Sequence, residues 1–195
     1  MKTSFEVTGP KKEFKKVSYN QFYEDYVKTC IECFCDTSSD GQSHNKYHDI
    51  VRPIYDNIPL PKRATIGSAG YDFVTPMRLV IPAHFTYTIP TGICASMEPG
   101  WVLQIYPRSS LGFKYGIQLV NTVGIIDSDY IYANNEGHII IKLINNSNDT
   151  VTIGAMERIV QGIFIQYGTT YNDAMILNSD DAQHRTGGFG STGQI

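Results

Sequence analysis

Short apolar or alternating runs, separated by turn residues, make up most of the chain from about residue 51 onward. The clearest runs are Leu79 to Ile81, Trp101 to Tyr106, Ile139 to Ile144 and Arg158 to Tyr167. Proline, glycine and asparagine residues bound them, and no segment of about twelve residues here keeps the 3.6-residue apolar period of a helix. The pattern predicts an all-β fold, a barrel or jelly-roll sandwich of short strands.

The first fifty residues follow a different pattern. Ser18 precedes Gln21 by three positions, which resembles a capping box at the start of a helix. Apolar positions then recur at helical spacing, at Phe22, Tyr26, Cys30 and Cys33. We therefore expect residues 1–50 to form an N-terminal extension that contains one helix, from about 18 to 34, followed by a loop.

The C-terminal end differs again. Residues 185–195 (RTGGFGSTGQI) are too rich in glycine to hold a strand or helix alone. We expect them to form a flexible arm that closes over an active site. Residues 51–184, between the extension and the arm, are expected to form the β domain.

Net charge and hydropathy limit the choice of partner. The 195 residues carry a formal net charge of −3, so the chain lacks the broad basic field that holds a nucleic-acid backbone. A few arginines in one cleft still suffice for a small phosphorylated ligand. No run of about 18 apolar residues occurs, and no apolar segment follows the basic N-terminus. We expect no membrane span, no secretory signal and a cytoplasmic location.

Three segments carry side chains suited to such a ligand. Asp72 follows the turn residues of Ser68–Ala69–Gly70, and the PRSSLG segment offers one guanidinium and two hydroxyls to phosphate oxygens, from Arg108, Ser109 and Ser110. In NTVGIIDSDY, the Asn121 amide precedes by six residues an aspartate, Asp127, that we expect to be buried among isoleucines. Singly, each segment also fits a turn or a backbone cap.

Five ordered motifs argue against a purely structural role, as turns or caps, for these segments. AGYDF, PRSSLG, NTVGIIDSDY, ERIVQ and RTGGFGSTG follow one another with matching spacing. Together they resemble the motifs of the trimeric dUTPase family, in its bacterial and phage-like branch, over about residues 58–195. The resemblance implies hydrolysis of dUTP to dUMP and pyrophosphate by water attack on the α-phosphate. That reaction keeps uracil out of DNA and supplies dUMP for thymidylate synthesis.

The resemblance also implies roles for the nucleoside residues. The carboxylate of Asp127 would orient and deprotonate the attacking water. Tyr130 would lie under the deoxyribose and leave no space for a 2′-hydroxyl. The uracil edge would pair with the Asn121 amide and with backbone groups of a hairpin at Gly124, Ile125 and Ile126. The motif then continues into a hairpin tip, 129–138, that is longer than usual for the family.

The remaining implied roles concern the triphosphate. The α- and β-phosphates would be held by Arg108, Ser109, Ser110 and Gln161. Asp72 would reach Mg²⁺ through coordinated water, without a protein cage for the metal. In the arm, Phe189 would stack on uracil, Gly190 and Ser191 would donate hydrogen bonds, and the γ-phosphate would pair with Arg185 or its rival His184. In the family the arm reaches a neighbouring subunit, so the resemblance implies a homotrimer with shared active sites.

Two other functions stay open at this stage. A dCTP deaminase-like enzyme of the same fold needs a glutamate after the third motif and an extra arginine in the second. Lys142–Asn145 contains no glutamate and Leu111–Gly112 no arginine, which argues against it. A regulatory binding protein on a dUTPase scaffold, contacting a protein partner through residues 1–50, is the other alternative.

A zinc site in the extension is a further question. The order C-x2-C, then H-x3-H, is met by Cys30, Cys33, His44 and His48. The intervening segment lacks the apolar residues around which a small zinc module packs, and the two cysteines fit the apolar face of the expected helix. Packing against the surface of the trimer is therefore favoured over metal binding.

Overall fold

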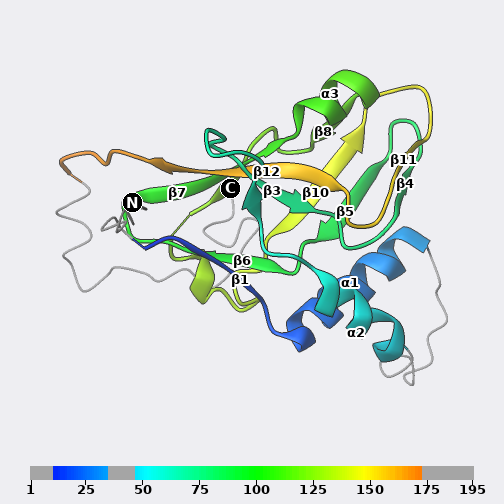
Figure 1. The fold of residues 1–195 in the computed structure, drawn as a ribbon, viewed down its shortest axis with the longest axis horizontal. Helices are drawn as coiled ribbons and strands as arrows, with labels where there is room; N and C mark the ends of the chain where they lie inside the picture. Colours follow the sequence, from blue (N-terminus) through cyan, green and yellow to red (C-terminus); the bar gives the residue numbers. More distant parts are fainter. Residues whose placement is uncertain (1–10, 35–46, 173–195) are drawn as a thin grey trace, which may run out of the picture.

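The structure is a computed structural model that describes residues 11–34 and 47–172 (Figure 1). The elements within these ranges are β1 (Glu13–Lys16), α1 (Tyr19–Phe34), α2 (His48–Asn57), β2 (Lys62–Arg63), β3 (Tyr71–Val74), β4 (Leu79–Ile81), β5 (Thr86–Pro90), β6 (Ile93–Ser96), β7 (Trp101–Pro107), α3 (Ser109–Tyr115), β8 (Ile117–Leu119), β9 (Gly124–Ile126), the 3-10 helix η2 (Tyr130–Tyr132), β10 (Ile140–Asn145), β11 (Val151–Ile153) and β12 (Arg158–Gln166). The predicted arm, with its candidate residues, lies outside the described residues.

Antiparallel sheets dominate the described part of the chain. The largest has the strand order β2-β3-β12-β7-β9, a second has the order β5-β10-β8, and two pairs, β11-β4 and β1-β6, complete the set. The sheets stay open and do not close into a barrel, so the predicted all-β fold is confirmed in its jelly-roll-like form.

Alternation along the strands places the core between the sheets. In β10 and β4, buried side chains alternate with more exposed ones, as expected for strands with one face turned inward. The fully buried side chains include Phe73, Leu79, Ile89, Leu103 and Leu143. Three of these residues come from predicted runs, and Phe73 and Ile89 come from β3 and β5, because period-two patterning is enough to define an inner face.

The extension belongs to the same core. Helix α1 is present where the sequence predicts a helix, and it packs against β5 and α2 below the sheets (Figure 1). Val17, Phe22, Tyr23 and Val27 are all buried in the cluster that contains the strand residues. Strand β1 pairs with β6. Removing the extension would therefore expose part of the core.

Two helices were not predicted. Helix α2 spans the expected boundary between residues 50 and 51 and contains Pro53, a residue that normally interrupts helices. Helix α3 has seven residues, too few to show an apolar period, and it ends at Gly116 with a left-handed φ of 67°. Both escape detection because their sequences carry breakers or are too short. Among the described residues, no helix is long and apolar enough to cross a membrane.

Candidate active site

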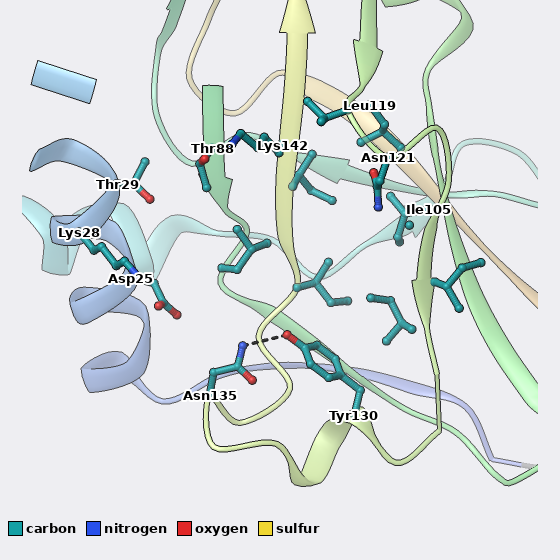
Figure 2. Close-up of a pocket in the computed structure, with 17 residues that line it drawn as sticks. Asp25, Lys28, Thr29, Thr88, Ile105, Leu119, Asn121, Tyr130, Asn135 and Lys142 are labelled. Atoms are coloured by element: carbon teal, nitrogen blue, oxygen red, sulfur yellow. Dashed lines mark hydrogen bonds between the residues drawn. The ribbon is translucent and has the colours of Figure 1, made fainter. Parts of the chain in front are cut away.

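A pocket of about 580 Å³ brings together most of the residues predicted to bind a nucleoside. Its lining contains Asn121, Gly124, Ile125, Ile126 and Tyr130. Figure 2 shows Asn121 on one side of the pocket, the side chains of α1 on the opposite side, and Tyr130 near the base. The volume is within the range of small-molecule sites, about 300–1,000 Å³.

Tyr130 is fixed by hydrogen bonds at its far end. The residue is 6% exposed and begins η2. Its hydroxyl donates to the backbone oxygen of His138 at 3.1 Å and accepts from Asn135 Nδ2 at 2.9 Å. Gly137, with a φ of 68°, lets the turn close over Tyr130, because a Cβ there would lie 2.8 Å from Ile131 Cα. The ring therefore has a fixed place in the pocket.

The segment around Gly124 is not the simple hairpin expected. Strand β9 pairs with β7 at the edge of the five-stranded sheet, and the 3-10 helix η2 follows in place of a hairpin tip. A Cβ at Gly124 would lie 3.1 Å from Ile105 Cβ, so glycine permits the close pairing. Asp127 comes directly after β9 and is exposed in the single chain. The expectation that it is buried among isoleucines is wrong for one chain, because Asp127 follows an edge strand that no further strand of the described residues flanks.

The residues predicted to bind phosphate form a separate cluster. On β12, Gln161 lies directly opposite Asp72 of β3. The Asp72 carboxylate pairs with Arg108 Nε at 3.2 Å and with a guanidinium nitrogen of Arg158 at 3.1 Å. Two guanidiniums with one carboxylate leave a net positive charge, which favours a phosphate group. We call the set of Asp72, Arg108, Arg158 and Gln161 the phosphate cluster.

Two features complete the phosphate cluster. Ser109 and Ser110 are exposed at the start of α3, directly after Arg108, so their hydroxyls are open to a ligand. At Gly70, an added Cβ would lie 2.5 Å from Gln161 Oε1, so only glycine leaves space for that side chain. The AGYDF motif thus serves the cluster through its glycine as well as its aspartate.

Asp127 and the phosphate cluster lie far apart within one chain. Ile126 of β9 is opposite Leu103 of β7, which places Asp127 beside Val102. Arg108 follows the other end of β7, six positions beyond Val102. At a rise of about 3.3 Å per residue, the backbones of Asp127 and Arg108 are separated by about 20 Å. The structure therefore brings the predicted site residues together as two groups.

The zinc question concerns residues that are only partly described. His48 stacks on Tyr23, with ring centroids 3.9 Å apart, and its Nδ1 lies 2.8 Å from the Tyr19 hydroxyl. The other three candidates, which are the Cys30 side chain, Cys33 and His44, lie outside the described residues or their described side chains. Over residues 11–34 and 47–172, no group of three or more histidine, cysteine, aspartate or glutamate residues could hold a metal ion.

Sequence reasoning missed the wall of the pocket formed by α1. Asp25, Lys28 and Thr29 all line it, and Thr88 and Lys142 line it from β5 and β10. Nothing in the sequence marks these positions, because a charged residue on an amphipathic helix is normally solvated. Only the packing of α1 against β5 brings them to the site.

An open antiparallel fold with a nucleoside-sized pocket and a separate arginine and serine cluster defines a nucleotide-binding β protein. Comparison with known proteins makes this specific. A family model described as dUTPase matches residues 56–193. The chain belongs to the dUTPase family.

Relatives support the assignment. The deoxyuridine 5′-triphosphate nucleotidohydrolase of Lactococcus lactis is 42% identical over 138 residues, which cover 70% of this chain and 89% of that protein. The enzyme of the same name from Finegoldia magna is 41% identical over 140 residues, covering 70% and 93%. Neither the family model nor these alignments account for the extension as a whole.

Solved structures agree on the fold. The crystal structure of dUTPase from Streptococcus mutans has a TM-score of 0.54 and 44% identity, and the match covers 57% of this chain and 88% of that one. A dUTPase from phage phi11 of S. aureus, described as coordinating a structural Mg(II) ion, has a TM-score of 0.52 at 20% identity over 59% and 88% of the two chains. At that identity the second match concerns the fold alone.

Proposed function

We propose that the chain hydrolyses dUTP to dUMP and pyrophosphate at active sites shared between the subunits of a homotrimer. The observation that carries this proposal is the division of the site residues. Asp127 adjoins the nucleoside pocket, whereas the phosphate cluster lies about 20 Å away along β7. In the proposed reaction both Asp127 and Arg108 act at the α-phosphate, so the two residues of one chain are too far apart to serve the same molecule.

Symmetry resolves this difficulty. In a closed three-fold assembly, the pocket of one chain can face the phosphate cluster of the next, and the same contact recurs three times. Asp127, on an exposed edge in one chain, is then placed at the junction. The predicted arm would reach the site from a neighbouring chain and supply Arg185, Phe189, Gly190 and Ser191. His184 is the rival of Arg185 for the γ-phosphate.

The pocket supplies recognition of the nucleoside. We assign the uracil edge to the Asn121 amide and to backbone groups of Gly124, Ile125 and Ile126, which line one side of the pocket. Tyr130, held by its two hydrogen bonds, is the platform for the deoxyribose. A rigid ring in that place excludes a 2′-hydroxyl by contact, and a polar edge left unpaired by cytosine costs about 1–3 kcal/mol.

The chemical step needs one base and groups that stabilise the negative charge on the leaving pyrophosphate. Asp127 accepts the proton of the water that attacks the α-phosphorus, and the bond from that phosphorus to the leaving oxygen breaks to release pyrophosphate. Arg108, Ser109, Ser110 and Gln161 stabilise the charge that moves onto the pyrophosphate.

The Asp72 carboxylate fits a hydrated metal ion better than a bare one. It already pairs with two guanidiniums, so it retains lone pairs for water but does not offer a cage. Mg²⁺ usually keeps several waters and takes other ligands from the phosphates. When bound, the ion neutralises part of the triphosphate charge. Asp72 would therefore have two roles: it orients Arg108 directly, and it would hold the ion through coordinated water.

Pyrophosphate release tests the proposal. Wild type with Mg²⁺ should release pyrophosphate from dUTP, and dCTP, dTTP and UTP should be poor substrates. Asp127→Asn should abolish release, whereas Asp149→Asn, on an exposed loop between β10 and β11, should not. Absence of release from dUTP in the wild type would contradict the proposed function.

A further inference from the structure

The extension lines the pocket and also contacts the residues that hold Tyr130 in place. Asp25, Lys28 and Thr29 line it from α1, opposite Asn121 (Figure 2). Of these, Asp25 has a partner that leads directly to Tyr130. That partner is His138, at the end of the turn that follows η2.

His138 is completely buried, and both of its ring nitrogens are engaged. The backbone N–H of Gly92 donates to His138 Nε2 at 2.7 Å. Because a backbone N–H can only donate, Nε2 is the unprotonated nitrogen, and Nδ1 carries the hydrogen that it donates to Asp25 Oδ2 at 2.5 Å. The extension thereby fixes the tautomer and the orientation of a residue with 0% exposure.

The charge state of Asp25 is consistent with this arrangement. Burial alone would raise its pKa, but hydrogen bonds from His138 and Gln21, together with the positive charge of Lys28, outweigh burial and hold the pKa below 3.8. Asp25 is therefore a carboxylate at neutral pH, and it accepts a charge-assisted hydrogen bond from the ring.

The backbone of His138 then holds Tyr130. The Tyr130 hydroxyl donates to His138 O at 3.1 Å, and Asn135 Nδ2 donates to the same oxygen at 3.2 Å. Any shift of His138 therefore moves the acceptor that fixes the Tyr130 ring. The path from Asp25 to Tyr130 consists of two hydrogen bonds and one residue.

A second tie attaches the start of α1 to the same turn. Glu136 accepts hydrogen bonds from the Ser18 backbone N–H at 2.6 Å and from the Ser18 hydroxyl at 2.7 Å. The Ser18 hydroxyl also accepts from the Gln21 N–H at 3.2 Å, which is one of the two hydrogen bonds of the predicted capping box. The Ser18 N–H, which the Gln21 side chain would accept in such a box, donates to Glu136 instead. Helix α1 is thus joined at two points to the turn that carries Tyr130.

We propose that α1 is a wall of the nucleoside pocket and that Asp25, acting through His138, is a positioning residue that sets the place of Tyr130. This inference rests on the proposed function, in which Tyr130 lies under the sugar. It extends substrate selection to the N-terminal extension, and it makes the choice between deoxyribose and ribose depend on a helix outside the matched family region.

The test compares selectivity among variants of the full chain. The measured quantity is the ratio of kcat/KM for dUTP to kcat/KM for UTP, which does not depend on the fraction of protein that is folded. Asp25→Ala removes the acceptor of His138 Nδ1–H and should lower the ratio by about tenfold, since a loosened Tyr130 admits the 2′-hydroxyl. Asp25→Asn keeps an acceptor oxygen and should restore most of the ratio.

Two further variants serve as a control and as a second test. Glu24→Ala, on the exposed side of α1, should leave the ratio unchanged. Glu136→Gln weakens the other tie at an exposed position, and it should lower the ratio by roughly threefold. It keeps the test valid if Asp25→Ala does not fold.

The outcomes separate the two proposals. An active wild type whose ratio is the same in Asp25→Ala and Glu136→Gln would overturn the inference and leave the proposed function intact. A ratio that falls equally in Glu24→Ala would also overturn it. A wild type that releases no pyrophosphate from dUTP would overturn both.

Discussion

The nucleoside pocket and the phosphate cluster are held in place in different ways. The cluster lies on neighbouring strands of one sheet, where ladder register sets Gln161 opposite Asp72 and ion pairs orient Arg108. The pocket is lined by α1 and by strands of two different sheets, and tertiary hydrogen bonds through the buried His138 hold Tyr130 at its base. Charge neutralisation thus depends on local strand geometry, whereas selectivity depends on packing from the extension.

The largest effect is expected at the junction of the two regions. Asp127→Asn removes the base but leaves the pocket and the cluster unchanged, so kcat for dUTP should fall by about 10³-fold or more with KM little altered. Steady-state pyrophosphate release, with Asp149→Asn as the control, measures it. A loss confined to KM would assign Asp127 to binding.

The dependence of the pocket on the extension predicts a large effect on stability. Phe22 is fully buried and packs on Tyr26, Tyr55 and the ring of His138. Phe22→Ala should lower the free energy of unfolding by about 3–5 kcal/mol, measured by urea denaturation. Glu24→Ala, exposed on the same helix, should change it by less than about 0.5 kcal/mol. Similar values for the two variants would show that the extension is not part of the core.

Within the phosphate cluster, loss of one guanidinium should weaken the handling of charge. Arg108→Ala leaves Asp72 paired with Arg158 alone and removes a positive group from the triphosphate. We expect kcat/KM for dUTP to fall by about 10²-fold, while the ratio of dUTP to UTP stays the same, because the pocket is untouched. Arg78→Ala, at an exposed turn, is the control. A changed ratio would contradict the separation of the two regions.

The smallest effect concerns pH and Asp25. Its pKa is lower in the folded chain than the ordinary 3.8, so its stabilisation is present in full above that value and is lost as the pH falls through the folded-state pKa. Asp25→Asn should unfold more easily than wild type at pH 7, by about 1 kcal/mol. Urea denaturation at decreasing pH should show the difference closing below pH 3.8. A constant difference would assign the effect to packing.

Strands β4, β7, β10 and β12, the helix α1 and the grouping of motifs were predictable from the sequence, whereas β1 was not expected in the extension. Period-two patterning defines an inner face, and Ser18 with Gln21 marks the helix start, since these signals are local. Helix α3 was missed because seven residues are too few for a period, and α2 because Pro53 argues against it.

The candidate site was predictable in its members but not in its arrangement. The motifs identify Asp72, Arg108 and Asp127, yet register along β7 is needed to show that they form two groups. The roles of Asp25 and His138 depend on a contact between residues 113 positions apart. No local pattern contains such a contact, because it arises only when α1 packs on the folded sheets.

Complementation between inactive variants tests the shared site most directly. Arg108→Ala and Asp127→Asn, each expected to have about 1% of wild-type activity or less, would be unfolded, mixed in equal amounts and refolded together, and pyrophosphate release from dUTP would be measured. If each site takes Asp127 from one chain and Arg108 from its neighbour, random trimers should regain about a quarter of the wild-type sites. A mixture as inactive as its components would contradict the shared site and place both groups in one chain.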